Sequence, residues 1–239
     1  MRSVVVLPTY DERENIEHFL PVLRAAMPGA DIVVVDDNSP DGTGQLADAL
    51  AAELGQIKVL HRAGKQGLGS AYRHGFQVAI DEGYDLIVSM DADFSHDPGA
   101  LATLVEAIGA GADVVVGSRY VPGGRTEHWP WHRRMLSRWG NRYTSFVLRL
   151  PVRDCTSGFR VYRAAALASI EPSTTEAEGY GFLTELLRRA HRHGLRVDEH
   201  PIVFRDRERG TSKMSSRIIV ESMLLVTRLA IGDLRTRRR

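Results

Sequence analysis

The first 118 residues alternate short apolar runs with amphipathic helical patterns, and this alternation restricts the fold more than any other feature. Apolar runs rich in Val and Ile, typical of buried strands, cover residues 4–7, 32–35, 59–60, 86–90 and 114–116. Helical patterns lie between them, at roughly residues 15–27, 43–54, 69–81 and 98–108. Alternation of this kind predicts an α/β fold, with a doubly wound, mostly parallel sheet and helices on both faces.

The pattern changes after Tyr120. A Gly/Pro-rich loop over residues 121–130 leads into a basic amphipathic helix from Arg133 to about residue 150. A strand near residues 155–163, a helix over 181–193 and a last amphipathic helix over 214–234 are expected to follow. The simplest organisation is one domain over residues 1–213. Residues 214–239 then form a C-terminal helix and basic tail, which belong to the same domain or contact a membrane surface.

Charge is divided unevenly along the 239 residues. Residues 1–118 carry 7 Lys/Arg and 18 Asp/Glu, a net of −11, whereas residues 119–239 carry 24 Lys/Arg and 12 Asp/Glu, a net of +12. This division indicates an acidic half that binds metal and a basic half that faces phosphate or a membrane. Ordinary solvated surface charge is the alternative.

Features that report on location favour a cytoplasmic protein. The single Cys155 excludes an intramolecular disulfide and fits a reducing compartment. Met1 and Arg2 lead straight into a strand-like run, so no signal peptide is expected. No apolar stretch reaches the roughly 18–20 residues that a membrane-spanning helix needs.

Paired carboxylates follow two of the expected strands. Asp91 and Asp93 come directly after the run 86–90. Asp97 before Pro98 explains the start of the next helix by capping, but leaves this pair unexplained. The two carboxylates are expected at the carboxyl edge of the sheet, where their oxygens are predicted to bind a hard divalent cation.

The ends of the first two strands carry further candidates. Tyr10 and Glu12 are expected around a nucleobase, although an acidic first helical turn also explains Glu12. Asp36 and Asp37 follow the second strand, and a turn capped by Thr43 does not explain two adjacent carboxylates. Their repulsion is expected to be relieved by a ligand, such as the hydroxyl groups of a bound nucleotide.

Basic residues of the second half could hold a phosphorylated partner. Arg119 follows the fifth strand and is expected to point to the same edge of the sheet. Arg207, Arg209 and Lys213 lie in a polar segment, for which a solvated charge run is the alternative.

Seven motifs in order identify a family. They are PTYDERENI, VVVDDNSPDGT, GLGSAYRHGF, MDADFSHDP, GSRYVPGG, TSGFRVYR and RERGTSK. The chain from Val4 to about Lys213 thereby resembles the dolichol-phosphate and polyprenol-phosphate mannose synthases, which are inverting family 2 glycosyltransferases with the GT-A fold. The resemblance implies GDP-mannose as donor, a polyprenyl monophosphate as acceptor, and Mg²⁺ or Mn²⁺ as cofactor.

Site residues follow from this resemblance by position. The donor site is expected to contain Pro8, Tyr10, Glu12, Asp36, Asp37, Asp91, Ala92, Asp93, Arg207 and Lys213, with Asp91 and Asp93 holding the metal. The acceptor phosphate is expected to contact Arg119, Arg133 and Ser137. The expected catalytic set is Asp91, Asp93, Arg119 and Arg133. Some members have a Gln as a further metal ligand where this chain has Ser95, so that ligand is in question.

The resemblance also implies a membrane surface as partner, because the acceptor carries a long apolar tail. Some members continue into transmembrane helices; this chain is instead expected to attach peripherally to the cytoplasmic face, with a separate membrane-anchoring partner as a further option. The helix from Arg133 and the last helix are candidates to lie in the interface, and packing on the core is the alternative.

Other functions remain as alternatives. A related synthase would use UDP-glucose or a UDP-N-acetylhexosamine. A non-catalytic nucleotide- or nucleic-acid-binding module is more remote, and nucleic acid is not expected as a partner because the acidic half repels a phosphate backbone. A nicotinamide-dependent dehydrogenase would need Gly-x-Gly-x-x-Gly where Pro8, Thr9 and Tyr10 stand. A signalling receiver domain would carry its acidic pair after the first strand and lacks the basic half.

Overall fold

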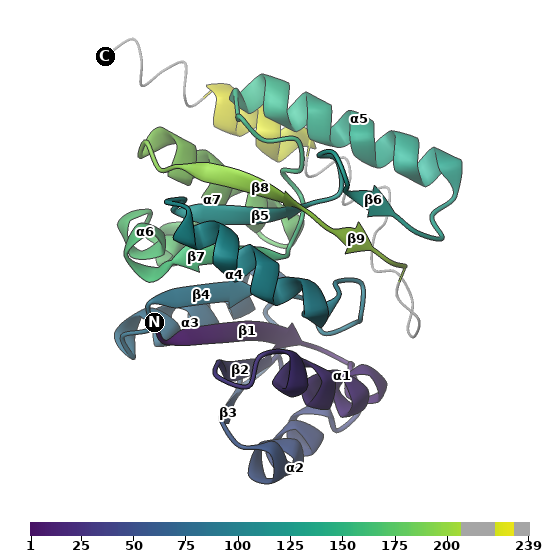
Figure 1. Ribbon diagram of the computed structural model, residues 1–239, viewed down its shortest axis with the longest axis vertical. Coiled ribbons are helices and arrows are strands. Elements are labelled where there is room, and N and C mark those ends of the chain that lie inside the picture. Colours follow the sequence, from purple (N-terminus) through teal and green to yellow (C-terminus); the bar gives the residue numbers. More distant parts are fainter. Residues whose placement is uncertain (207–222, 232–239) are drawn as a thin grey trace.

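The computed structural model describes residues 1–206 and 223–231, and a seven-stranded sheet forms its centre (Figure 1). The strands are β1 (Ser3–Thr9), β2 (Asp31–Asp36), β3 (Ile57–His61), β4 (Leu86–Ser89), β5 (Val114–Ser118), β7 (Arg160–Arg163) and β8 (Val197–Pro201). Their order is β3-β2-β1-β4-β7-β5-β8, and β7 alone runs antiparallel to its neighbours. A second sheet pairs β6 (Arg125–Thr126) with β9 (Val203–Phe204).

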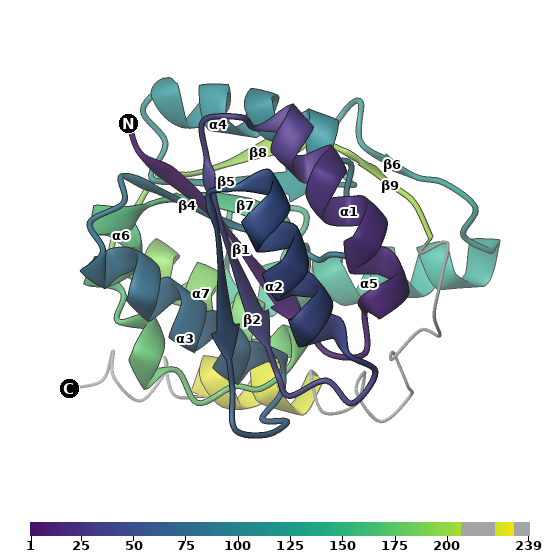
Figure 2. The same ribbon diagram turned by 90° about the horizontal axis from the view of Figure 1, so that it is seen from below.

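Helices cover both faces of the sheet (Figure 2). One face packs on α1 (Arg13–Ala26), α2 (Thr43–Leu54) and α4 (Leu101–Gly109), and the other on α3 (Leu68–Asp81), α6 (Ala164–Ser169) and α7 (Tyr180–Arg192). Short 3-10 turns, Pro98–Ala100 and Pro172–Thr174, precede α4 and α7. Successive strand residues point to opposite faces, so Val4 and Val6 enter one core while Val5 and Leu7 enter the other. Burial on both faces explains the continuous apolar runs.

Helix α5 (Trp131–Leu148) lies beside the β5–β8 side of the sheet, with the helix at 223–231 next to it (Figure 1). The two helices are linked by a hydrogen bond of 2.9 Å between the hydroxyls of Tyr143 and Thr227. Val226 is buried in the core shared with α3 and α7. The described part of the last helix therefore packs on the core. Nowhere in residues 1–206 or 223–231 is a helix long and apolar enough to cross a bilayer.

The predicted fold class is confirmed, and every strand and helix expected in the first 118 residues is present. The sequence did not indicate β6, β8, β9 or α6, nor that β7 is antiparallel. β8 reads Val-Asp-Glu-His-Pro, which lacks an apolar run. The division at residue 213 falls outside the described residues and stays a prediction.

Candidate active site

Parallel pairing brings the predicted donor residues to one edge of the sheet. In the register of β1 with β2, Thr9 lies opposite Asp36, and β4 lies on the other side of β1. The carboxyl ends of these strands therefore open together, as ligand sites of doubly wound sheets do. The following residues lie at this edge: Pro8, Tyr10, Glu12, Asp36, Asp37, Asp91, Ala92, Asp93 and Arg119.

Asp36 and Asp37 are both buried, and each has partners within the chain. Asp36 accepts hydrogen bonds from the Ser39 hydroxyl at 2.6 Å and the Ser39 backbone N–H at 3.1 Å. Asp37 forms an ion pair with Arg62 at 2.7 Å and accepts the backbone N–H groups of residues 66 and 67. Partners within the chain therefore compensate these charges without a ligand, and the donor contacts of Asp36 and Asp37 stay a prediction. The predicted N-cap at Thr43 is also wrong: Thr43 is the first residue of α2, whose N-cap is Gly42, and its N–H and hydroxyl groups donate to Asp41.

Tyr10 and Glu12 follow β1 at the entrance to α1. The ammonium group of Lys65 lies 3.7 Å from the centre of the Tyr10 ring, within the range of a cation–π contact. Glu12 accepts a hydrogen bond of 2.6 Å from the Asn15 amide. The two predicted nucleobase contacts are thus brought to one edge, and Lys65 adds a positive charge beside them that the sequence did not single out.

Asp91 and Asp93 lie just beyond β4, with Asp91 partly exposed and Asp93 buried. One oxygen of Asp93 accepts the Ser95 backbone N–H at 3.0 Å. The buried Tyr72 hydroxyl lies 3.4 Å from Asp91 Oδ1 and 3.2 Å from the Met90 carbonyl. Burial, followed by the charge of Asp91, raises the pKa of Tyr72 well above its usual value. Tyr72 therefore stays protonated, and its one O–H group is within reach of both the Met90 carbonyl and Asp91.

These two carboxylates fit a Mg²⁺ or Mn²⁺ ion that is shared with a substrate. In the described ranges, no group of three or more His, Cys, Asp or Glu side chains could hold a metal ion by itself. Mg²⁺ commonly takes one or two carboxylates and completes its shell with water and substrate phosphates. A pair of hard oxygen donors at the open edge of the sheet matches that chemistry.

His96 is buried beneath this loop and serves packing. Its ring contacts Phe159 and Phe204 at centroid distances of 5.2 Å each, and its backbone bridges to Phe204 of β9. Within residues 1–206 and 223–231, its Nε2 has no hydrogen-bond partner. Burial lowers the pKa of His96 to about 4, so the ring is neutral at neutral pH.

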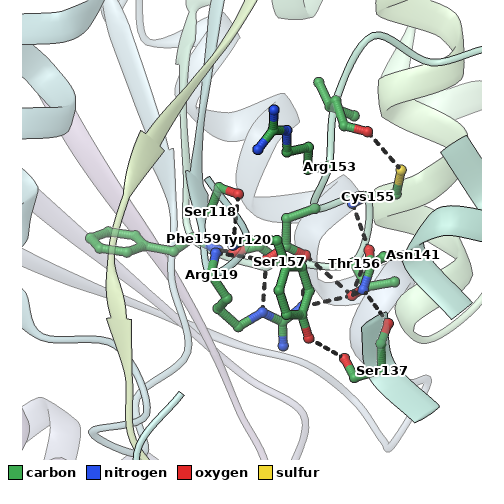
Figure 3. A network of polar contacts seen from close by, with 12 residues as sticks. Ser118, Arg119, Tyr120, Ser137, Asn141, Arg153, Cys155, Thr156, Ser157 and Phe159 are labelled. Atoms are coloured by element: carbon green, nitrogen blue, oxygen red, sulfur yellow. Dashed lines mark hydrogen bonds and ion pairs between the residues drawn. The ribbon is translucent and has the colours of Figure 1, made fainter. Parts of the chain in front are cut away.

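Arg119 is anchored by a carboxylate that the sequence did not reveal. Its Nε and one terminal nitrogen each donate to Asp154 at 2.7 Å. The same terminal nitrogen donates to the Thr156 hydroxyl (Figure 3). Burial favours a higher pKa for Asp154, but the charge and hydrogen bonds of Arg119 outweigh it and lower the pKa below its usual value. Arg119 thus lies at the predicted edge, within a buried polar network.

Arg133 and Ser137 lie one turn apart on α5, close to Arg119. The Arg133 guanidinium lies 4.1 Å from the centre of the Trp129 ring and donates to Asp206 at 2.8 Å. Ser137 accepts a hydrogen bond of 2.6 Å from the Tyr120 hydroxyl (Figure 3). The guanidinium carbon of Arg119 also lies 5.7 Å from the centre of the Trp129 ring. The indole therefore contacts both arginines that are predicted to bind the acceptor phosphate.

A groove of about 760 Å³ runs between α5 and residues 119–124. Its charged lining consists of arginines, and in the described part of the chain no acidic side chain lines it. The lining residues that project from α5 and the following loop include Arg138, Arg142, Phe146 and Arg153. A groove with arginines and apolar side chains in its lining is suited to a ligand that carries an anionic group next to an apolar chain.

Arg207, Arg209 and Lys213 lie outside the described residues, so their predicted role stays a prediction. The residues that sequence reasoning missed are chiefly partners of predicted ones: Arg62, Lys65, Tyr72, Trp129, Asp154 and Asp206. Asp154 lies two residues before the quoted motif TSGFRVYR, and this position was the available signal. Its pairing with a residue 35 positions away has no local pattern.

A doubly wound sheet with paired carboxylates at its open edge is the arrangement of a glycosyltransferase. The chain aligns in structure with a mannosyltransferase from Pyrobaculum calidifontis, solved in complex with GDP-Man and Mn2+, with a TM-score of 0.61 and 16% identity over 98% of this chain and 74% of that one. At that identity the likeness concerns the fold. The model of glycosyl transferase family 2 matches residues 4–170, and the chain belongs to this family.

Two curated relatives cover nearly the whole chain. A polyprenol monophosphomannose synthase of Mycolicibacterium smegmatis is 46% identical over 96% of this chain and 87% of its own length. An undecaprenyl-phosphate mannosyltransferase of Micrococcus luteus is 47% identical over 97% of this chain and 95% of its own length.

Proposed function

We propose that this glycosyltransferase moves mannose from GDP-mannose to a polyprenyl monophosphate and inverts the anomeric carbon. The observation that carries the proposal is the pair of relatives at 46% and 47% identity, whose names specify mannose and a polyprenyl phosphate. The solved mannosyltransferase with GDP-Man and Mn2+ supports the donor and the metal through a shared fold. The paired carboxylates at the end of β4 supply the chemistry that such a donor needs.

In this proposal Asp91 and Asp93 would hold the divalent cation, and Tyr72 would help to orient Asp91. When bound, the cation neutralises the negative charge that grows on the departing diphosphate. Tyr10, Glu12 and Lys65 lie where the nucleoside would be held, at the end of β1. Asp36, through its hydrogen bonds with Ser39, and Asp37, through its pair with Arg62, position the loop next to them.

The acceptor phosphate provides its own nucleophile. A phosphate monoester has a second pKa near 6, so an oxyanion is present at neutral pH and no side chain has to remove a proton. One oxygen of the phosphate forms the new bond to the anomeric carbon, and the bond from that carbon to the GDP oxygen breaks. Arg133 and Ser137 orient this phosphate, while Arg119 supports them from the buried network beneath.

The proposed reaction is tested with the purified chain, GDP-mannose and undecaprenyl phosphate, in Mn²⁺ or in EDTA. Polyprenyl phosphomannose in the organic phase, lost in EDTA, is the expected product. UDP-glucose and UDP-N-acetylglucosamine in parallel reactions test the alternative donors. If a UDP-sugar is the better donor, the sugar assignment fails, and if neither class is used the function fails.

Membrane association is proposed through α5. Five large apolar side chains of this helix are exposed: Trp131, Met135, Leu136, Trp139 and Phe146. Trp131 is 68% exposed and Phe146 85% exposed, which is unusual for an amphipathic helix packed only on its own core. Arg134, Arg138 and Arg142 form a stripe beside them. Exposed aromatic residues next to arginines are typical of helices that lie in the interface of an anionic bilayer.

Flotation with liposomes tests this surface. The double substitution W131S and F146S should abolish flotation on vesicles that contain phosphatidylglycerol, while V22S should leave it intact. Val22 is the matched control because it is also an exposed apolar residue but belongs to α1. Flotation unchanged by the α5 substitutions would remove this helix from the attachment. Whether a separate membrane-anchoring partner exists stays a prediction.

A further inference from the structure

Arg133, the predicted acceptor-phosphate ligand on α5, holds the carboxylate of Asp206. The distance from the guanidinium to Asp206 Oδ2 is 2.8 Å. We propose that Asp206 occupies the position on Arg133 that the acceptor phosphate takes, so that the acceptor binds by displacing this carboxylate. The inference rests on the proposed function and deepens it, because it makes Asp206 a residue that sets acceptor affinity without contacting the acceptor.

Two arginine–carboxylate pairs at this site differ in how easily they exchange. Arg119 and Asp154 share two parallel hydrogen bonds, and their side chains are 7% and 0% exposed. Arg133 and Asp206 share a single hydrogen bond, and their side chains are 26% and 36% exposed. Separating the first pair would leave a buried charge without compensation, whereas Asp206 can turn to water. Exchange with a phosphate is therefore expected at Arg133 and not at Arg119.

Trp129 keeps Arg133 in place during such an exchange. The guanidinium lies 4.1 Å from the ring centre, and the indole is buried against Phe204 with ring centres 5.3 Å apart. A cation–π contact uses the face of the guanidinium, while hydrogen bonds use its edge. The contact with Trp129 can therefore persist when the N–H groups at the edge of the guanidinium change their hydrogen-bond partner. Arg133 is prepared for an oxyanion before the acceptor arrives.

The incoming group is a stronger partner than the one it replaces. A phosphate monoester carries a charge of about −1.5 to −2 at pH 7 and three acceptor oxygens, against a single charge on a carboxylate. Its oxygens can also accept two N–H groups of one guanidinium. Because Asp206 belongs to the same chain, weak and singly charged anions are at a disadvantage against it. Asp206 thus favours a phosphate over lesser anions at Arg133.

Substitution of Asp206 by Asn tests the competition directly. The probe is farnesyl phosphate, whose binding is measured by calorimetry in the absence of donor, so that affinity is read without turnover. D206N should bind it about two- to fivefold more tightly, the effect expected of a partly exposed ion pair. The KM for the acceptor should fall by a similar factor, while the KM for GDP-mannose and kcat stay near the wild-type values. D206E, which keeps the charge, should restore wild-type binding.

The matched control is D198N. Asp198 pairs with Arg196 at 2.8 Å and its side chain is 38% exposed, so the substitution removes the same charge from a similar pair on β8. It should leave farnesyl phosphate binding unchanged. In an R133A background, D206N should have no further effect.

Each outcome is decisive. Weaker binding by D206N would show that Asp206 positions Arg133 for the phosphate, and unchanged binding would show that the two do not compete; either result overturns the inference. If the wild-type protein neither binds farnesyl phosphate nor forms polyprenyl phosphomannose, the proposed function fails first. Wild-type binding and turnover with an unresponsive D206N variant would instead overturn only the competition.

Discussion

Arg119 and Asp154 form a buried bidentate ion pair that ties the end of β5 to the loop before β7. The backbone N–H of Arg119 donates to the same carboxylate at 3.0 Å. The pair therefore fixes both the backbone and the guanidinium at the edge where the active site is proposed. In the proposed reaction this pair would keep Arg119 in place beneath the acceptor phosphate.

Replacing Asp154 by Asn should destabilise the protein by about 3–5 kcal/mol, because Arg119 would keep its charge in a buried place. The loss of stability at acidic pH should also report on this ion pair. The folded pKa of Asp154 lies below its usual value, so its contribution is present above about pH 4 and is lost as the pH falls through the folded pKa. Urea unfolding at neutral pH and at successively more acidic pH should show a shallower acid loss for D154N. Parallel acid profiles would contradict the assignment.

Asp93 should be required for turnover that depends on a divalent cation. D93A is expected to lose activity by a factor of about a hundred or more, because the leaving diphosphate would lack its counter-charge. D97A is the control from the same loop: Asp97 accepts the Gly99 N–H at 2.8 Å and caps the helix start. Loss of this cap should lower the free energy of unfolding by about 1 kcal/mol and leave the activity largely intact. Mn²⁺ titration of both variants checks this, and a metal-dependent, active D93A would refute the site.

Tyr72→Phe should weaken the cation site while the core stays packed. The rings of Phe76 and Phe182 lie 5.3 and 6.1 Å from the Tyr72 ring and would pack equally on Phe. Loss of the hydroxyl should cost about 1 kcal/mol of stability and raise the half-saturating Mn²⁺ concentration severalfold. Because the pKa of Tyr72 is raised well above its usual value, the wild-type rate should show no step from this group up to about pH 10. An unchanged Mn²⁺ requirement would mean that Tyr72 does not orient Asp91.

Arg133→Ala should raise the KM for polyprenyl phosphate about ten- to a hundredfold, which corresponds to the loss of a charged hydrogen bond. The KM for GDP-mannose should stay near its wild-type value. R125A removes the same charge from a nearby exposed arginine that pairs with Glu127, and serves as control. Steady-state kinetics with each substrate varied in turn measure both constants. An equal loss toward donor and acceptor would indicate misfolding in place of a specific acceptor contact.

The sequence predicted the fold, and also that the candidate residues gather at the carboxyl edge of the sheet, because both follow from local patterns. Val-rich runs define β1, β2, β4 and β5, and strand ends in a parallel sheet must meet. The ion-pair partners of the site residues could not be predicted. The pairs Asp37–Arg62 and Arg119–Asp154 join residues 25 and 35 positions apart, and no periodicity encodes such contacts. The argument from repulsion between Asp36 and Asp37 failed for this reason.

Two helical glycines should respond to substitution in opposite directions. A Cβ on Gly75 would lie 2.4 Å from Val6 Cγ1, because α3 packs closely on β1. G75A should therefore destabilise the protein by about 1–3 kcal/mol, despite the higher helix propensity of Ala. Gly140 lies within α5 and a Cβ there would meet nothing within 4 Å. G140A should stabilise by about 0.5–1 kcal/mol. Urea unfolding of the two variants compares them, and a G75A variant as stable as the wild type, or more stable, would contradict the close packing of α3 on the sheet.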